Sequence, residues 1–136
     1  VIVPDLPLYE YEELYKEDFI KNGLSNIFLV TPQTSPERIK KIDELSNGFI
    51  YLLSSSSTTG KTLDVSDAIG EYYKKVKAMN LKNPLIIGFG ISDEASFKRA
   101  NLYANGAIVG SAFVKTLENK ADYLSHIDGF VREIRG

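Results

Sequence analysis

The chain has 136 residues and a mass of 15.2 kDa, enough for one domain with a sizeable core. Its 43% hydrophobic and 25% charged residues are close to the globular average, which argues against a disordered chain. The net charge of −2 provides no basic field for a nucleic-acid backbone or an anionic membrane. The lack of cysteine excludes disulfides, thiolate metal sites and cysteine nucleophiles, and one histidine, His126, excludes a multi-histidine metal site.

The sequence also bears on membrane insertion and on secretion. No apolar run approaches the roughly 20 residues that span a bilayer. No basic segment followed by an apolar one opens the chain, so we expect no signal peptide and a cytoplasmic location. The chain opens with Val1-Ile2-Val3 rather than methionine, as a strand would begin in the middle of a domain.

Five short apolar runs rich in β-branched residues predict five strands. They are Val1–Val3, Asn26–Val30, Phe49–Leu53, Leu85–Ile87 and Ala107–Val109. Most lack strict alternation, which is typical of parallel strands covered on both faces.

A helical pattern follows each apolar run. The first predicted helix is Tyr9–Lys21, with a stop at Gly23. The second is capped by Ser35, has Pro36 at its first position and ends near Asn47-Gly48. The third is Val65–Met79, with Asp64 as cap and Asn80 as stop. A fourth begins at Ser92-Asp93-Glu94-Ala95, where Ser92 fits a cap without a full capping box, and ends near Asn105-Gly106. Residues Ser111–Arg135 predict a short and a longer helix broken near Asn119.

This strict alternation predicts an α/β fold with a parallel sheet and right-handed crossovers. Two closures fit: an open doubly wound sheet, or part of a (β/α)8 barrel. Five strands make an adequate open sheet but an incomplete barrel.

The turn after the third predicted strand, Ser55 to Thr62, nearly matches the phosphate loop GxxxxGK[ST]. Ser55 replaces the first glycine, and no apolar strand ending in Asp follows as a magnesium ligand. A solvated loop is therefore favoured over a nucleotide-binding loop.

Two further turns are glycine-rich: Gly88-Phe89-Gly90-Ile91-Ser92 and Gly110-Ser111-Ala112. Each follows a strand and precedes a helix, where bare amides and the positive helix end suit an anion, although each alone could be a tight turn or a cap. Together, with the second opening a short extra helix, they match the phosphate site of barrels after strands seven and eight. We therefore expect phosphate binding.

Other candidates have structural alternatives. Asp5 at a strand end could be catalytic or could cap a rigid turn between two prolines. Tyr51 lies within a strand and could line a pocket or fill the core, and His126 falls in the last helix, where a surface or helix-packing role is favoured. Tyr72-Tyr73-Lys74-Lys75 reads as a core-facing aromatic beside a solvated basic face. No second acid joins Asp5, so no complete acid–base pair is present.

In combination these motifs resemble the tryptophan synthase alpha chain family. The resemblance rests on Val3-Pro4-Asp5-Leu6-Pro7, Ile27-Phe28-Leu29-Val30-Thr31-Pro32, Gly48-Phe49-Ile50-Tyr51-Leu52-Leu53-Ser54, Thr59-Gly60, Gly88-Phe89-Gly90-Ile91-Ser92 and Gly110-Ser111-Ala112-Phe113-Val114-Lys115. It covers essentially all of residues 1–136, from strand four to the C-terminal helix of that family's single (β/α)8 barrel domain, here an incomplete barrel of five βα units.

The resemblance implies a lyase of tryptophan biosynthesis that cleaves indole-3-glycerol phosphate to indole and glyceraldehyde 3-phosphate. It implies a beta-chain partner in an alpha2-beta2 complex, with pyridoxal phosphate belonging to that partner and no cofactor or metal on this chain. By position, Gly60, Gly90, Gly110 and Ser111 would hold the substrate phosphate. Tyr51, Phe89 and Ile108 would contact the indole ring, with Pro4 and Ile2 nearby.

The resemblance also assigns roles to two further residues and shows where the chain departs from the family. Thr59 resembles a threonine that supports loop closure, and Asp5 resembles an aspartate near the beta-chain face. Ser55 and Ser57 replace an Arg and a Gly of the family's loop. The catalytic Glu and Asp lie upstream of Val1, so we expect no catalytic residue in this chain and an inactive fragment.

Two other interpretations stay open: another phosphate-binding barrel enzyme, or a non-catalytic phosphate-binding or interaction module. Because five strands cut from a barrel leave two open edges, the chain is also expected to self-associate or to pack with a copy of the missing part.

Overall fold

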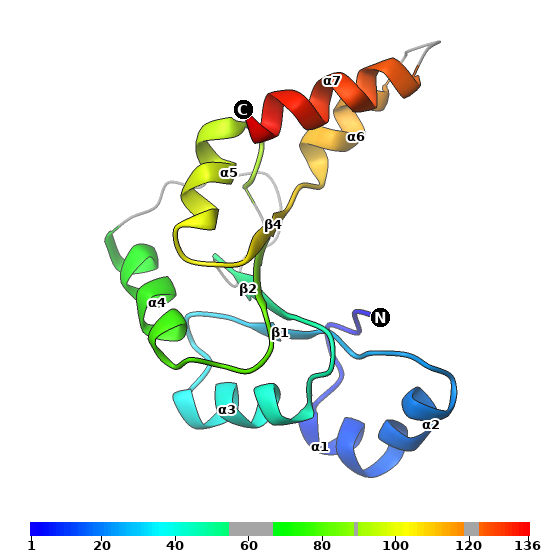
Figure 1. Cartoon of the computed structure of the whole chain (residues 1–136). Coiled ribbons are helices and arrows are strands. Elements are labelled where there is room, and N and C mark those ends of the chain that lie inside the picture. The colour runs from blue at the N-terminus through cyan, green and yellow to red at the C-terminus, as the bar shows by residue number, and fades with distance from the viewer. Residues whose placement is uncertain (55–66, 89, 119–122) are drawn as a thin grey trace.

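The computed structural model describes residues 1–54, 67–88, 90–118 and 123–136. Strands and helices alternate along the chain after an N-terminal helical stretch (Figure 1). The elements are α1 (Leu8–Glu10), η1 (Tyr11–Tyr15), α2 (Lys16–Lys21), β1 (Phe28–Val30), α3 (Pro36–Leu45), β2 (Ile50–Leu53), α4 (Asp67–Ala78), β3 (Leu85–Gly88), α5 (Glu94–Asn101), β4 (Gly106–Ile108), α6 (Ser111–Leu117) and α7 (Tyr123–Arg135).

The strands form one parallel sheet in the order β1-β2-β3-β4, so the predicted α/β class is confirmed. The prediction that Val1–Val3 forms the first strand is wrong. The segment makes a single bridge, Ile2 beside Ile27, with one backbone hydrogen bond from the Ile27 amide to the Val1 carbonyl at 2.8 Å. Within the described residues this segment has a sheet neighbour on one side, and its side chains stay 39–54% exposed.

One face of the sheet carries the core. Alternate strand positions on this outer face are buried, and helices η1, α3, α4 and α5 pack against them (Figure 1). The strand residues involved are Phe28, Val30, Ile50, Leu52, Leu85 and Ile87. This burial is the main driving force for the fold, since each fully buried aliphatic side chain contributes about 1.5–3 kcal/mol.

The opposite, inner face is apolar but only partly covered. Its positions follow from the register, which aligns Leu29, Tyr51, Ile86 and Gly106 across the four strands, and then Leu53, Gly88 and Ile108. The side chains of Leu29, Tyr51, Leu53, Ile86 and Ile108 are half-buried. The alternating burial along the strands thus reflects one face under helices and one face that is only partly covered.

The predicted helix Tyr9–Lys21 is a continuous helical stretch in which η1 forms a wider π turn. Tyr11, buried in that turn, meets Phe19 and Phe28 edge to face, with ring centroids 5.3 and 5.1 Å apart. The stop at Gly23 is confirmed: its φ is +63°, the Leu24 amide donates to the Phe19 carbonyl, and the Gly23 amide to the Ile20 carbonyl. This pair of bonds is the Schellman motif, which needs a left-handed residue at this position.

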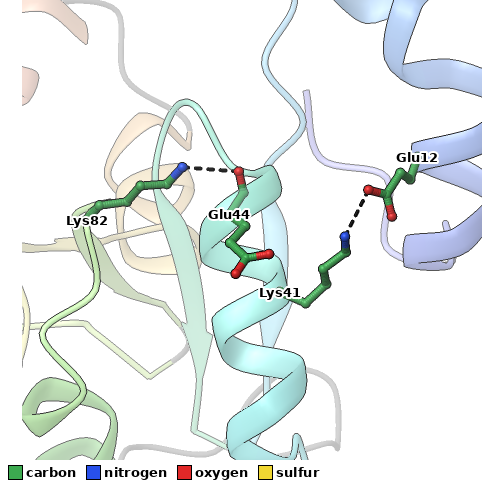
Figure 2. A network of polar contacts seen from close by, with 4 residues as sticks. All are labelled: Glu12, Lys41, Glu44 and Lys82. Atoms are coloured by element: carbon green, nitrogen blue, oxygen red, sulfur yellow. Dashed lines mark hydrogen bonds and ion pairs between the residues drawn. The ribbon is translucent and has the colours of Figure 1, made fainter.

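Helix α3 begins as predicted, because Ser35 caps it by accepting from the Arg38 amide, and Pro36 is its first residue. Long side chains then tie α3 to both neighbours (Figure 2). Lys41 pairs with Glu12 of η1 at 2.9 Å, and Lys82, in the segment before β3, donates to the Glu44 carbonyl at 3.1 Å. The hydrogen bond that Lys41 donates to the Glu12 carboxylate raises the pKa of Lys41.

The remaining helices end largely where expected. Asn80 adopts a left-handed conformation, φ +51°, after α4, which suits a helix stop. The predicted start at Asp64–Val65 and the predicted break at Asn119 lie outside the described residues. Helix α5 ends at Asn101, before the expected Asn105-Gly106, and α6 and α7 are the short and longer helices predicted near the C-terminus.

Candidate functional site

The candidate site lies at the carboxyl ends of the strands, where parallel sheets bind ligands. Gly88 of β3 pairs with Ile108 of β4, and Gly90 and Gly110 each follow two residues after these partners. The two predicted glycine turns therefore leave the sheet side by side, at equivalent positions on adjacent strands. This adjacency is what a shared phosphate site requires.

Gly90 has φ +75°, a conformation that other residues rarely adopt. The helix that follows is capped differently from the prediction. Asp93, not Ser92, is the N-cap, and it forms a full capping box with Ser96. The Ser96 amide donates to the Asp93 carboxylate at 2.8 Å, and the Asp93 amide donates to the Ser96 hydroxyl at 3.1 Å.

The capping box changes the anion argument for this turn. The Ser92 amide is also taken, at 3.1 Å from the Ser96 hydroxyl, and hydrogen bonds from Ser96 lower the pKa of Asp93. A carboxylate already occupies the positive end of α5, so this helix start does not suit a second anion. The prediction missed this cap because it placed the cap one residue early, at Ser92 with Ala95 three residues on, whereas the structure uses Asp93 with Ser96.

The start of α6 is arranged in the opposite way. Gly110 is its N-cap and supplies no side-chain cap. A Cβ at Gly110 would meet no atom of the described residues within 4 Å, and Gly110 and Ser111 are both exposed. The amides of a first helical turn have no acceptor within the helix, so those of Ser111 and Ala112 can take an anion, with the Ser111 hydroxyl as a further donor.

The predicted indole wall falls on the inner face of the sheet. Tyr51 and Ile108 both point to this face and are half-buried, and burial raises the pKa of Tyr51. Ile2 is aligned with Ile27 and continues the same apolar surface beyond β1, whereas Pro4 lies in an exposed turn. The structure thus assembles one apolar surface next to the glycine turns.

Two tyrosines of α4 hold that helix to the strand ends. The Tyr72 hydroxyl donates to the Val30 carbonyl at 3.1 Å, at the end of β1. Tyr73 is buried in the core, which raises its pKa to about 12. The prediction of a core-facing aromatic beside a solvated face is confirmed, since Lys74 and Lys75 are exposed.

Three predicted site residues, Thr59, Gly60 and Phe89, lie outside the described residues. Asp5 is exposed in the turn after the first segment. His126 is half-buried in the α6–α7 pair, as the helix-packing prediction requires, and lines a cavity of about 330 Å³ that the sequence did not indicate. In the described ranges no cluster of three or more His, Cys, Asp or Glu could hold a metal ion, and no helix is long and apolar enough to cross a membrane.

Comparison with known proteins gives a consistent result. A family model described as tryptophan synthase alpha chain matches residues 1–131. The chain is 53% identical to a tryptophan synthase alpha chain of Flavobacterium psychrophilum, over 98% of this chain and 52% of that protein.

Solved structures agree with the sequence relatives. The tryptophan synthase A-subunit of the hyperthermophile Pyrococcus furiosus superposes with a TM-score of 0.78 at 30% identity, over 98% of this chain and 53% of that one. A tryptophan synthase complex from Pyrococcus furiosus gives a TM-score of 0.76 at 29% identity, over 98% and 52%. The chain therefore spans about half the length of the relatives it matches, and its sheet corresponds to an incomplete barrel.

Proposed function

Because the chain belongs to the tryptophan synthase alpha chain family, we propose that it forms the phosphate-binding part and one indole-contacting wall of a lyase of tryptophan biosynthesis. The reaction is the cleavage of indole-3-glycerol phosphate to indole and glyceraldehyde 3-phosphate. In this proposal residues 1–136 are the C-terminal portion of one (β/α)8 barrel domain. The enzyme works in the cytoplasm.

The observation that carries the proposal is the pairing of the two glycine turns. Gly90 and Gly110 follow register partners on β3 and β4, and α6 begins without a side-chain cap. Phosphate oxygens would accept from the amides of Gly110, Ser111 and Ala112 and from the Ser111 hydroxyl. Gly60 completes the set by family position.

The indole ring would then lie on the inner face of the sheet. Tyr51 and Ile108 offer half-buried apolar surface there, and Phe89, Ile2 and Pro4 complete the wall by family position. An aromatic ring held on such a surface loses water from the face that lies against it, which favours indole over a polar group. This chain's residues bind and orient the substrate, and proton transfer belongs to the family's Glu and Asp, which match no residue here.

The partner in this proposal is the tryptophan synthase beta chain, which carries the pyridoxal phosphate. The likeness to a subunit of the Pyrococcus furiosus tryptophan synthase complex supports it. Asp5, exposed in its turn, is the residue of this chain that the family resemblance puts near that partner. On its own, the chain would also associate with itself through the open edges of its sheet.

The test is a titration of isotope-labelled 136-residue chain followed by amide NMR, first with inorganic phosphate and then with indole-propanol phosphate. Phosphate should shift the amides of Gly90, Gly110 and Ser111. The indole compound should bind more tightly and add shifts at Tyr51 and Ile108. Ser111→Ala should weaken both ligands, and Ser92→Ala, an exposed serine at a helix start whose amides are already capped, should not.

Three outcomes separate the alternatives. Shifts with phosphate that gain nothing from the indole group would point to a plain phosphate-binding module. If phosphate still shifts the amides in Ser111→Ala but no longer does so in Ser92→Ala, the anion binds at the start of α5 instead. No shift at Gly110 and Ser111 with either ligand would overturn the proposal.

A further inference from the structure

Asparagine followed by glycine occurs three times in the sequence, as Asn22-Gly23, Asn47-Gly48 and Asn105-Gly106. Such a pair is chemically labile, because glycine has no Cβ that would keep its amide nitrogen away from the carboxamide carbon of the asparagine before it. Asparagine is accordingly among the residues that heat and time damage first. The structure distinguishes the three pairs by what holds the glycine amide and the asparagine carboxamide in each.

The first pair is held at the end of α2. The Asn22 side-chain amide donates to the Asp18 carbonyl at 2.7 Å. The Gly23 amide donates to the Ile20 carbonyl at 3.1 Å, as part of the Schellman motif described above. Both groups that would have to react are therefore engaged, and each must leave its partner before the two can meet.

The third pair is held by the sheet. The Asn105 side-chain oxygen accepts from the Leu85 amide at 2.9 Å, and the Asn105 amide donates to the Leu85 carbonyl at 2.8 Å. Gly106 is the first residue of β4 and is aligned with Ile86 of β3. Turning the Asn105 carboxamide toward the Gly106 amide would break the hydrogen bond that its oxygen accepts.

The second pair has no such restraint. Asn47 and Gly48 lie in the connection between α3 and β2, at the amino ends of the strands. Asn47 is exposed, and within the described residues neither its carboxamide nor the Gly48 amide has a hydrogen-bond partner. Both sheet neighbours of β2 belong to this chain, so this connection is already flanked on each side.

Close packing explains why a glycine stands at position 48. A Cβ there would lie 2.9 Å from Cδ1 of Ile27 and 3.5 Å from Cβ of Ser25. Ile27 is buried, so it has little room to move aside. The labile pair is therefore a consequence of how the sheet packs, since a larger residue after Asn47 would crowd β1.

We propose that Asn47 is a site of spontaneous deamidation in the folded chain, with water as the co-reactant. The Gly48 amide nitrogen gives up its proton to solvent and bonds to Cγ of Asn47, the Cγ–Nδ2 bond breaks, and ammonia leaves. Water then opens the succinimide ring that has formed. Opening at Cγ gives aspartate, and opening at the main-chain carbonyl gives isoaspartate, which lengthens the main chain by one methylene.

The product places a new carboxylate just beyond the C-cap of α3, which is Ser46. This is the negative end of the helix, and Asp43 and Glu44 already add negative charge in its last turn. The deamidated chain should therefore be less stable than the original. Asn47 lies at the opposite edge of the sheet from Gly110 and Ser111, so the proposal is independent of phosphate binding there.

The test is to age the purified 136-residue chain at mildly alkaline pH, folded in one sample and unfolded in urea in another. Peptide mass spectrometry with electron-transfer fragmentation follows all three pairs and separates isoaspartate from aspartate. In urea the three should convert at similar rates, because glycine follows each asparagine. In the folded chain Asn47 should convert faster than Asn22 and Asn105 by about tenfold or more, because their hydrogen bonds must open first.

Two variants sharpen the test. Asn47→Gln should remove the fast reaction, because a glutamine would have to close a larger ring, and Asn22→Gln, the matched control, should leave the conversion of Asn47 unchanged. Aged wild type should unfold at a lower urea concentration than fresh protein, whereas aged Asn47→Gln should not.

The contrary results are equally specific. A folded chain in which Asn47 converts no faster than Asn22 or Asn105 would overturn the proposal, and so would fast ammonia release that persists in Asn47→Gln. Rates that differ among the three pairs in urea as they do in the folded chain would show that the fold does not select the site. Conversion of Asn47 with no loss of stability would overturn the argument from charge at the end of α3.

Discussion

The ring of Tyr51 lies directly over Gly88 of the neighbouring strand. Tyr51 is aligned with Ile86, so its side chain leans along the sheet toward the carboxyl ends of the strands. A methyl group at Gly88 would overlap both the ring and the hydroxyl of Tyr51. The two residues therefore share one space, and the direction of Tyr51 depends on the absence of a side chain at Gly88.

This relationship predicts that Gly88→Ala destabilises the chain. Overpacking of this kind costs about 1–3 kcal/mol in the free energy of unfolding, measured by urea denaturation. Adding Tyr51→Leu should recover part of that loss, since the smaller side chain vacates the space. Gly110→Ala is the control, because a Cβ there meets no atom within 4 Å in the part of the chain that the structure describes, and it should leave the unfolding midpoint unchanged. Equal effects of the two glycine variants would contradict the steric explanation.

A second prediction concerns Asp43, whose carboxylate accepts from the amides of Lys82 and Asn83, both at 2.9 Å, and from the Asn83 side chain at 2.8 Å. These bonds join α3 to the segment before β3. Asp43→Ala leaves three donors without this acceptor and should lower the free energy of unfolding by about 1–3 kcal/mol. Glu44→Ala, next to it and exposed, should have little effect in the same urea experiment.

The same carboxylate predicts an acid dependence. Burial alone would favour the protonated form, but the hydrogen bonds from Asn83 and Lys82 outweigh it, so the pKa of Asp43 lies below its ordinary value of 3.8. The stabilisation is therefore fully present above about pH 4 and is lost as the pH falls through the lower, folded-state pKa. The difference in unfolding free energy between wild type and Asp43→Asn should shrink over that acid range. A difference that stays constant would show that the charge of Asp43 contributes nothing.

The two tyrosines of α4 predict the behaviour at high pH. Burial raises the pKa of Tyr73 to about 12 and raises that of Tyr72 as well, above the ordinary value of 10.0. Between pH 10 and 12 the unfolded chain loses these protons and the folded chain keeps them, so stability falls as the pH rises. Tyr73→Phe should flatten this decline in urea unfolding, whereas Tyr9→Phe, on an exposed side chain, should not.

The last prediction concerns activity. The 136-residue chain alone should release no measurable indole from indole-3-glycerol phosphate, because the family's two catalytic carboxylates match none of its residues. The measurement is indole release by the purified chain, with its intact mass verified. Turnover near that of a complete alpha chain would show that residues of this chain perform the proton transfers.

Much of the local structure could be predicted because the signals lie within a few residues. Ser35 and Pro36 start α3, and Gly23 ends the first helical stretch, as expected. The cap of α5 was predicted one residue early, because Ser92 and Asp93 are both good caps and only the bonds with Ser96 distinguish them. The placement of Tyr51, left open between pocket and core, depended on a glycine far along the chain and could not be predicted from its own neighbours.

The sequence by itself determined the order of strands and helices, the parallel class of the sheet and the position of both glycine turns at its carboxyl edge. These follow from apolar periodicity and from the rule that parallel strands end on the same side. Only the tertiary structure decided that Val1–Val3 makes one bridge instead of a full strand, and that the inner face of the sheet stays half-covered. It also decided that a capping box occupies the amides at the start of α5, whereas α6 starts without a side-chain cap. The physical reason is that a strand edge, a helix end and a sheet face are completed by groups distant in sequence, and which groups arrive is set by packing.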